Sequence, residues 1–221
     1  MIRLEEVSKQ FHGGRRALDR ITLDVAAGEY VAVCGPAGAG KSSLLDVLAL
    51  LQPPGQGRYL LGGADYAGAR DSVQDAVRRK QIGYVFQELH VLNEQSVAVN
   101  VALGLGASRP NAEQSEAMAT LLERFGLAER MDDPVAHLSR SEKYVVALAR
   151  AVVGRPPLLL ADEPVATFDA RQTSQAMQLL RTLHEQGTTI VMATNDPACA
   201  AHAPRCIQLR EGRITVDARV R

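Results

Sequence analysis

The sequence has no tryptophan, and aromatic residues make up only 4% of its 221 positions. Platforms that stack single-stranded nucleic acid need exposed aromatic rings, so this scarcity argues against such a surface. Cysteines are also few, because Cys34, Cys199 and Cys206 are the whole set and none forms a CxxC pair. An odd number without paired spacing predicts neither a disulfide framework nor a zinc site.

An excess of one charge and a long apolar run are missing as well. The 25 Lys and Arg residues balance the 25 Asp and Glu residues, so no overall field draws the chain to nucleic acid or to an acidic membrane. The longest apolar stretches, such as 44–51, fall well short of the roughly 20 residues that span a bilayer. The first residues carry charges where a signal peptide needs an apolar run. We therefore expect a soluble, cytoplasmic chain without a nucleic-acid partner, which meets a membrane only through another protein.

Apolar periodicity divides the chain into alternating strands and helices. Residues 2–8 and 20–25 alternate apolar and polar positions and predict an antiparallel edge sheet. Further strands are predicted at 30–34, 57–62, 81–86, 158–162 and 188–193, with a final hairpin at 206–209 and 213–216. Helices are predicted at 41–51, 111–125, 139–153 and 170–186. This order predicts one α/β domain over 1–221, with a mainly parallel sheet and an inserted helical subdomain at about 90–155.

A glycine-rich segment between a predicted strand and a predicted helix matches the pattern G-x-x-x-x-G-K-[ST]. Its residues are Gly35, Pro36, Ala37, Gly38, Ala39, Gly40, Lys41, Ser42 and Ser43. In such a P-loop the backbone N–H groups surround phosphate oxygens, and the helix N-terminus adds partial positive charge. Lys41 is expected to reach the β- and γ-phosphates, and the Ser42 hydroxyl to ligate Mg²⁺. The alternative, a chance glycine-rich turn, does not account for the strand before the segment and the helix after it. The sequence thus predicts a P-loop NTPase core that binds ATP with magnesium.

Two carboxylates follow the apolar run 158–161. Asp162 is expected to hold Mg²⁺ through water, and Glu163 to orient or deprotonate the attacking water. An apolar strand that ends in Asp-Glu is common by itself, and only its combination with a P-loop favours this interpretation.

Together with what lies between them, these two motifs resemble the ATP-binding subunits of ABC transporters over essentially the whole chain. The resemblance is strongest to the small subunits that serve macrolide efflux, lipoprotein release and the cell-division complex. It implies that Gln87, in the segment 82–87, is the Q-loop glutamine that contacts magnesium and senses the membrane partner. It also implies that Phe11 stacks on adenine, for which the alternative is a core phenylalanine.

The segment before the second acidic motif is similar to the family signature LSGGE…AIARA. It consists of Leu138, Ser139, Arg140, Ser141 and Glu142, followed by the run 147–151. Ser139 and Glu142 also match a helix capping box. In the family two subunits close head to tail, and the signature helix of one points at the γ-phosphate held by the other. The resemblance therefore implies a second ABC subunit, identical or different, and an integral membrane permease as partners.

The chain departs from the family pattern at positions that act across the dimer or on the γ-phosphate. Arg140 and Ser141 replace the two signature glycines, and Asn195 replaces the switch histidine. Residues 143–145 and 165–168 also differ from the usual motifs. A side chain obstructs the close approach that glycine permits, and asparagine cannot carry the charge of histidine. Rescue is conceivable if Arg140 acts as an arginine finger or if Ser141 donates its hydroxyl, whereas the plain alternative is a solvated surface arginine.

We therefore predict an ATPase that converts ATP and water to ADP and phosphate, with strong binding and slow hydrolysis. The first predicted role is to drive a transport permease, and the alternative is a non-transport regulatory ATPase acting on a membrane partner. A nucleotide kinase is disfavoured by the Q-loop and the signature-like helix. A DNA-repair or chromosome-organising role is disfavoured because long coiled coils and zinc modules are missing.

Overall fold

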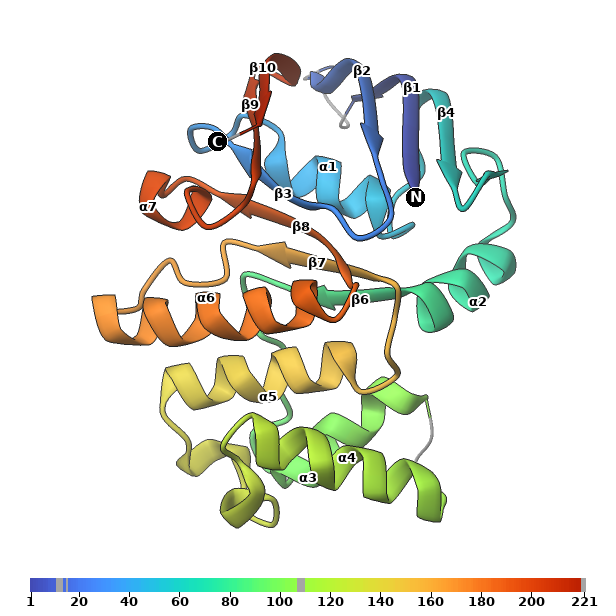
Figure 1. The fold of residues 1–221 in the computed structure, drawn as a ribbon. Helices are drawn as coiled ribbons and strands as arrows, with labels where there is room; N and C mark the ends of the chain where they lie inside the picture. The colour runs from blue at the N-terminus through green and yellow to red at the C-terminus, as the bar shows by residue number, and fades with distance from the viewer. Residues whose placement is uncertain (11–13, 15, 107–109, 220–221) are drawn as a thin grey trace.

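The computed structural model describes residues 1–10, 14, 16–106 and 110–219. Its strands form two sheets (Figure 1). The first is antiparallel with the order β2-β1-β4-β5. Its strands are β1 (Ile2–Gln10), β2 (Arg16–Val25), β4 (Gln56–Leu61) and β5 (Ala64–Asp65). The predicted antiparallel edge sheet is thus confirmed, and both of its first strands are longer than the sequence indicated.

The second sheet has the order β10-β9-β3-β8-β7-β6. Its strands are β3 (Tyr30–Cys34), β6 (Ile82–Val85), β7 (Leu158–Asp162), β8 (Thr189–Thr194), β9 (Arg205–Arg210) and β10 (Arg213–Arg219). The strands from β9 to β6 run parallel, and β10 pairs antiparallel with β9. All residues of β3, β7 and β8 are buried, as expected for strands covered on both faces.

Seven α-helices and three short 3₁₀ turns lie among the described residues. The helices are α1 (Lys41–Leu48), α2 (Asp71–Gln81), α3 (Val97–Ala102), α4 (Ala112–Arg124), α5 (Arg140–Val152), α6 (Ala170–Glu185) and α7 (Pro197–Ala200). The 3₁₀ turns are η1 (Leu103–Leu105), η2 (Ala128–Arg130) and η3 (Val135–His137). Helix α1 ends earlier than the predicted 41–51, because Leu50 adopts a left-handed φ of 56°.

The side chains of β7 alternate between two hydrophobic clusters. Leu160 belongs to the cluster that joins the core sheet to α1 and the antiparallel sheet. Leu159 belongs to the cluster on the opposite face, with Leu148 of α5 and Leu180 of α6. A third cluster joins α3, α4 and α5, so α5 packs on both the core and the other two helices. In Figure 1 these layers follow one another from the antiparallel sheet and α1 to the helices α3 and α4.

Helix α2 was not predicted. Its apolar side chains are few and small: Val73 is exposed, Val77 is only partly buried against the core, and the one buried residue is Gln74, so the periodic apolar signal is weak. The basic residues Arg78, Arg79 and Lys80 lie in the last turn of this helix. Basic side chains there are favourable next to the partial negative charge of a helix C-terminus.

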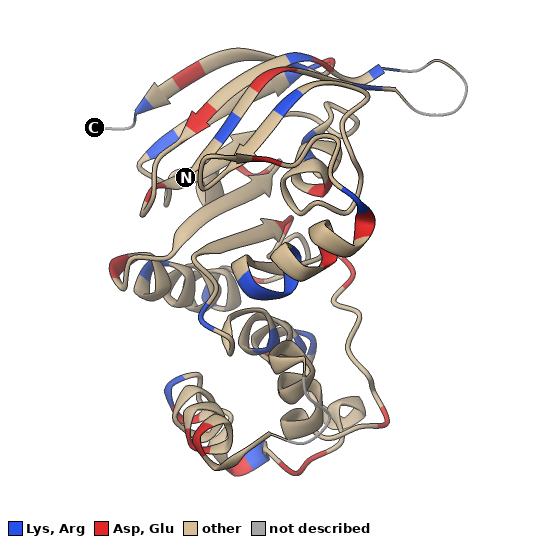
Figure 2. Ribbon diagram, turned by 90° about the vertical axis from the view of Figure 1, so that its right-hand side faces the viewer, with Lys and Arg blue, Asp and Glu red and all other residues tan. Residues whose placement is uncertain are grey.

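Acidic and basic positions are mixed along the strands in Figure 2, so this view shows no face of a single charge sign. Among the residues that the structure describes, no helix combines the length and the apolar character needed to cross a bilayer.

Candidate nucleotide-binding site

The register of the core sheet brings the predicted site residues to one edge. Cys34, directly before the P-loop, is level with Thr194, directly before Asn195. Asp162 is level with Ala193 on the other side of β8. Gln87 follows β6, which pairs with β7. Because carboxyl ends of parallel strands meet at the same edge of a sheet, four segments far apart in the sequence converge there.

Two glycines fix the path of the P-loop. Gly35 has φ 155°, and a Cβ there would lie 2.2 Å from the carbonyl oxygen of Leu209. Gly40 has φ 107°, and a Cβ there would lie 2.4 Å from the carbonyl oxygen of Ala17. Both contacts involve backbone, which cannot swing aside as a side chain can. A side chain at either position would displace the loop from its supports.

The C-terminal hairpin β9–β10 supports the P-loop from behind. The N–H of Gly212, in the turn of this hairpin, donates to the carbonyl of Ala39 over 2.9 Å. The carbonyl of Gly212 in turn accepts from the N–H of Asp19 over 2.9 Å. The turn therefore connects the phosphate loop to β2, a link that no sequence pattern indicates.

The P-loop lysine is buried, and its ammonium group already lies within hydrogen-bonding distance of three oxygen atoms. Its Nζ donates to the carbonyl oxygens of Gly35 at 2.9 Å and Pro36 at 3.3 Å. It also lies 3.2 Å from Oε1 of Glu163, and both side chains of this ion pair are at most 9% exposed. The pair places an anionic oxygen on Lys41, the group expected to bind the γ-phosphate.

Glu163 is held at its other oxygen as well. Its Oε2 accepts from the backbone N–H of Asn195 over 3.1 Å, and its backbone has the left-handed φ of 44°. The side chain of Asn195 is exposed. The segment after β8 therefore contacts Glu163 through its main chain, an interaction that does not depend on which residue stands at the switch position.

Asp162 has the properties of a metal-binding carboxylate. It is 5% exposed, and its Oδ1 is buried without a hydrogen-bond partner among the described residues. Burial raises the pKa of this carboxyl, while the Ser42 hydroxyl and Lys41 oppose the rise. An unsatisfied buried oxygen next to Ser42 fits a hydrated Mg²⁺, which prefers oxygen ligands and keeps several waters. No cluster of three His, Cys, Asp or Glu is found in the described part of the chain.

The signature segment forms the start of α5 and has the predicted capping box. Ser139 is the N-cap, its Oγ accepts from the N–H of Glu142, and the Glu142 carboxylate accepts from the N–H of Ser139. Ser139 Oγ also donates to Glu142 Oε2 over 2.7 Å. These bonds, led by the Ser139 hydroxyl, lower the pKa of Glu142. Arg130 pairs with the other carboxylate oxygen at 3.1 Å.

Arg140 is exposed and lines a small cavity of about 60 Å³ together with Gln87 and Glu163 of the same chain. The substituted signature position thus lies next to the chain's own Q-loop and acidic motif. No ion pair is found for Arg140 among the described residues. Phe11, the expected adenine platform, lies outside the described residues.

Two contacts at the start of α5 were not anticipated from the sequence. Nε2 of Gln172 donates to Oγ of Ser141 over 3.3 Å. The rings of Tyr144 and Phe168 meet edge to face, with centroids 5.6 Å apart and planes at 86°. Both contacts join the start of α5 to the start of α6 and involve positions where the chain departs from the family pattern. The departures were visible in the sequence, but nothing in it indicated that they touch.

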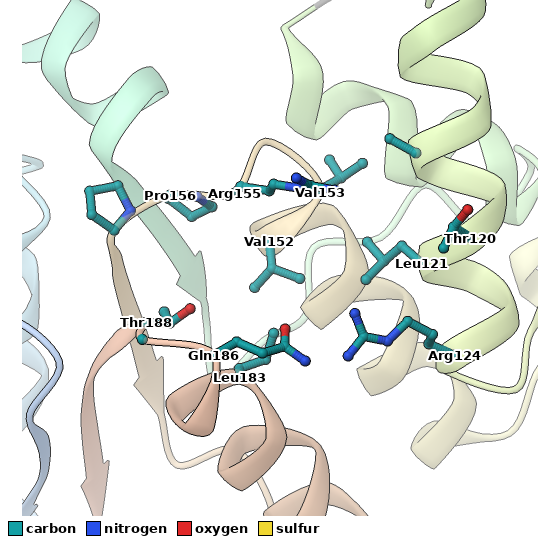
Figure 3. Close-up of a pocket in the computed structure, with 13 residues that line it drawn as sticks. Thr120, Leu121, Arg124, Val152, Val153, Arg155, Pro156, Leu183, Gln186 and Thr188 are labelled. Carbon is teal, nitrogen blue, oxygen red and sulfur yellow. The ribbon is translucent and has the colours of Figure 1, made fainter.

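A separate hollow of about 470 Å³ lies between α4, the end of α5 and the end of α6 (Figure 3). Arg124 and Gln186 point into the space between α4 and α6 in this view. The hollow also borders Pro157 and Thr188, which directly precede β7 and β8. It therefore lies at the amino-terminal edge of the sheet, away from the candidate site.

Comparison with known proteins identifies the class to which this fold and site belong. A family model described as ABC transporter matches residues 18–166, which include the P-loop, the Q-loop, the signature and the acidic motif. The dimeric structure of a bacterial ABC transporter cassette, MJ0796, superimposes with a TM-score of 0.92 and 30% identity, over 100% of this chain and 99% of that one. A post-hydrolysis structure of the same cassette with ADP and Pi gives 0.89 and 27% identity. The chain belongs to the ABC transporter family and is an ABC-type ATPase cassette, which confirms the predicted family, fold and enzyme class.

Among its relatives, the macrolide export ATP-binding/permease protein MacB of Brucella melitensis is 37% identical over 98% of this chain. The chain spans only 34% of the length of that relative. An uncharacterized ABC transporter ATP-binding protein of Bacillus subtilis, YknY, is also 37% identical, over 97% of this chain and 95% of its own length.

Proposed function

We propose that this chain is a motor that binds Mg-ATP, closes as a dimer with a second ABC subunit, and drives a membrane permease. The observation that supports this most directly is the convergence of the P-loop, Asp162, Glu163, Asn195 and Gln87 at one edge of the core sheet. The relative named as an ATP-binding/permease protein supports a permease partner. In this role the protein is cytoplasmic and attached to the inner face of the membrane through that partner.

ATP binding begins by replacing an interaction of the Lys41 side chain. The γ-phosphate takes the place of the Glu163 carboxylate on Lys41, because two anions cannot share one buried ammonium group at full strength. Glu163 is thereby released from Lys41 and becomes available to orient the attacking water. Residues 35–43 hold the phosphates, and Phe11 stacks on the adenine.

Mg²⁺ would be held by Ser42, Asp162 and Gln87 together with phosphate oxygens. When bound, the ion supplies positive charge that stabilises the transferred phosphoryl group. Asp162 already has the desolvated, unpaired oxygen that this role requires.

The same chain hydrolyses ATP slowly in this proposal. Arg140 and Ser141 add side chains where the family has glycines, so they obstruct close backbone approach to the partner's γ-phosphate. Loss of one preorganised donor to a developing charge costs about 10²- to 10³-fold in rate. Asn195 keeps its backbone bond to Glu163 but has no group that can carry a proton.

The first testable prediction concerns turnover. Restoring the family residues with Arg140→Gly, Ser141→Gly and Asn195→His together should raise kcat by about 10²-fold or more, while Mg-ATP affinity of the isolated chain stays the same. Steady-state phosphate release and calorimetry measure the two quantities. Lys41→Ala is the control, and it should abolish both binding and turnover.

ATP hydrolysis should be slow in a heterodimer as well. One of its two sites would still contain Asn195, and the other would still receive the altered signature, so turnover is slow with either kind of partner. Wild-type turnover equal to that of the triple variant would contradict slow hydrolysis. Failure of the wild type to bind Mg-ATP would contradict the function as a whole.

The altered signature favours one second candidate, a non-transport regulator in which ATP-driven closure is itself the signal. Such a role tolerates slow hydrolysis. Purification from membranes separates the two, since a motor should co-purify with a multi-span permease and a regulator with a membrane protein that transports nothing.

A further inference from the structure

The hydroxyl groups of the signature segment form a directed chain of hydrogen bonds that begins on another helix. Gln172 is the third residue of α6 and belongs to its capping box, where its Oε1 accepts from the N–H of Asp169 over 3.1 Å. This bond fixes which end of the amide faces outward. The Nε2 end therefore points at α5 and donates to Ser141 Oγ.

At the other end of this series of hydrogen bonds, the Ser139 hydroxyl already donates its proton to Glu142. Ser139 Oγ donates to the Glu142 carboxylate at 2.7 Å, a short bond to a charged acceptor. Glu142 is held in place by the N–H of Ser139 at 2.8 Å and by Arg130 at 3.1 Å. Releasing the Ser139 hydroxyl toward a phosphate would break the strongest bond in the group.

Ser141 is in a different position. Its oxygen accepts from Gln172, so its own proton is free to be donated, and the only acceptor within reach among the described residues is Ser139 Oγ at a long 3.3 Å. A hydroxyl that accepts one hydrogen bond becomes a better donor in the next. An incoming phosphate oxygen would outcompete the weak contact with Ser139.

The edge-to-face contact between Tyr144 and Phe168 keeps the two helix starts together. Tyr144 lies one turn after Ser141 on α5, and Phe168 directly precedes the N-cap of α6. The distance between Gln172 and Ser141 is therefore set by a packed, buried contact as well as by the hydrogen bond.

From this arrangement we propose that the Ser141 hydroxyl is the phosphate donor of the altered signature, and that Gln172 is the positioning residue that orients it. The proposal rests on the trans role of the signature described under the proposed function. It is compatible with slow turnover, because one oriented hydroxyl restores binding to the γ-phosphate without restoring the close backbone approach of two glycines.

The decisive variant is Gln172→Glu. Glutamate keeps the acceptor that caps Asp169, but it replaces the donor facing Ser141 with an acceptor, so the Ser141 proton turns toward residue 172 and away from the phosphate. Ser141→Ala removes the hydroxyl while retaining the Cβ. Each single variant should raise the concentration of a non-hydrolysable ATP analogue, with Mg²⁺, needed for half-maximal dimerisation by about tenfold, as expected for loss of one hydrogen bond to a charged group. Light scattering measures the dimer.

The double variant separates positioning from a structural effect. If Gln172 acts through Ser141, adding Gln172→Glu to Ser141→Ala changes nothing further, whereas a general effect of charge or folding would multiply. Gln175→Glu, an exposed position three residues further along α6, adds the same charge at a residue with no hydrogen bond to Ser141 among the described residues, and it should resemble the wild type.

Single variants that dimerise like the wild type, or single effects that multiply in the double variant, would overturn the proposal. Binding of the analogue to the wild-type monomer is measured in parallel by calorimetry. A wild type that binds but does not dimerise contradicts the trans signature and this proposal together. If the wild type dimerises and the variants need the same concentration of analogue for half-maximal dimerisation, only the role of Ser141 and Gln172 is contradicted.

Discussion

Among the described residues, Oδ1 of Asp162 is buried and has no hydrogen-bond partner, which costs stability. A buried charge is tolerated where function needs it, and Asp162 is the residue expected to hold the metal. The pKa of the Asp162 carboxyl is raised above its usual value, and burial is the largest cause.

Asp162→Asn should therefore stabilise the ligand-free protein and weaken Mg-ATP binding. Because burial raises the pKa of this carboxyl, removal of the charge should increase the free energy of unfolding at pH 7. The folded pKa is raised, so the wild-type cost is complete above that pKa and disappears below the unfolded value, where both states are protonated. Denaturant unfolding at pH 7 and at pH below 4 should show the gain only at the higher pH. A variant that is less stable at pH 7, or that binds Mg-ATP as well as the wild type, would contradict this.

At the scale of single residues the sequence identified the candidates but not their contacts. Lys41, Ser42, Asp162 and Glu163 could be named because each stands in a motif whose spacing follows from phosphate chemistry. The ion pair between Lys41 and Glu163 could not be predicted, because it joins the first residue of α1 to the residue after β7, and these positions are far apart in the sequence. The role of Phe11 stays a prediction.

At the scale of elements, helix capping explains why the start of α5 was predicted and why α2 was missed. The start of α5 could be predicted because Ser139 and Glu142 form a local motif that needs no tertiary information. Helix α2 was missed because its single buried residue is polar and it lacks a side-chain cap. Strands β7 and β8 were located to within a residue, since an unbroken apolar run bounded by polar residues is typical of a buried parallel strand.

Ser139→Ala tests whether the α5 cap is structural, functional or both. Removing the cap should lower the free energy of unfolding by about 1 kcal/mol. Asn111→Ala is the matched control, because Asn111 forms the same capping box on α4, away from the signature. Thermal denaturation should show similar losses for both variants, whereas only Ser139→Ala should weaken ATP-dependent dimerisation. Equal dimerisation in the two variants would limit Ser139 to a structural role.

At the scale of the whole molecule, ligand binding and folding are linked because the site is built from four segments of one core sheet. An unfolded chain cannot assemble them, so Mg-ATP should bind only the native state. At a free ligand concentration 100 times Kd this contributes about 2.7 kcal/mol. For a domain of this size each kcal/mol raises Tm by about 2–4 °C.

Thermal unfolding with and without Mg-ATP should therefore differ by several degrees in the wild type and coincide in Lys41→Ala. ATP with a chelator in place of magnesium should give a smaller shift, because Asp162 then faces the phosphates without the cation between them. Equal shifts in the wild type and in Lys41→Ala would show that ATP binds elsewhere.

The support of the P-loop by the last hairpin has a consequence for biosynthesis. The phosphate loop leaves the ribosome well before the Gly212 amide that holds Ala39 and the Leu209 carbonyl that confines Gly35, because both of these follow it in the sequence. A nascent chain thus contains the whole phosphate-binding motif long before the backbone groups that support the loop have been synthesised. We therefore expect nucleotide binding to begin only after the hairpin β9–β10 has folded against the loop.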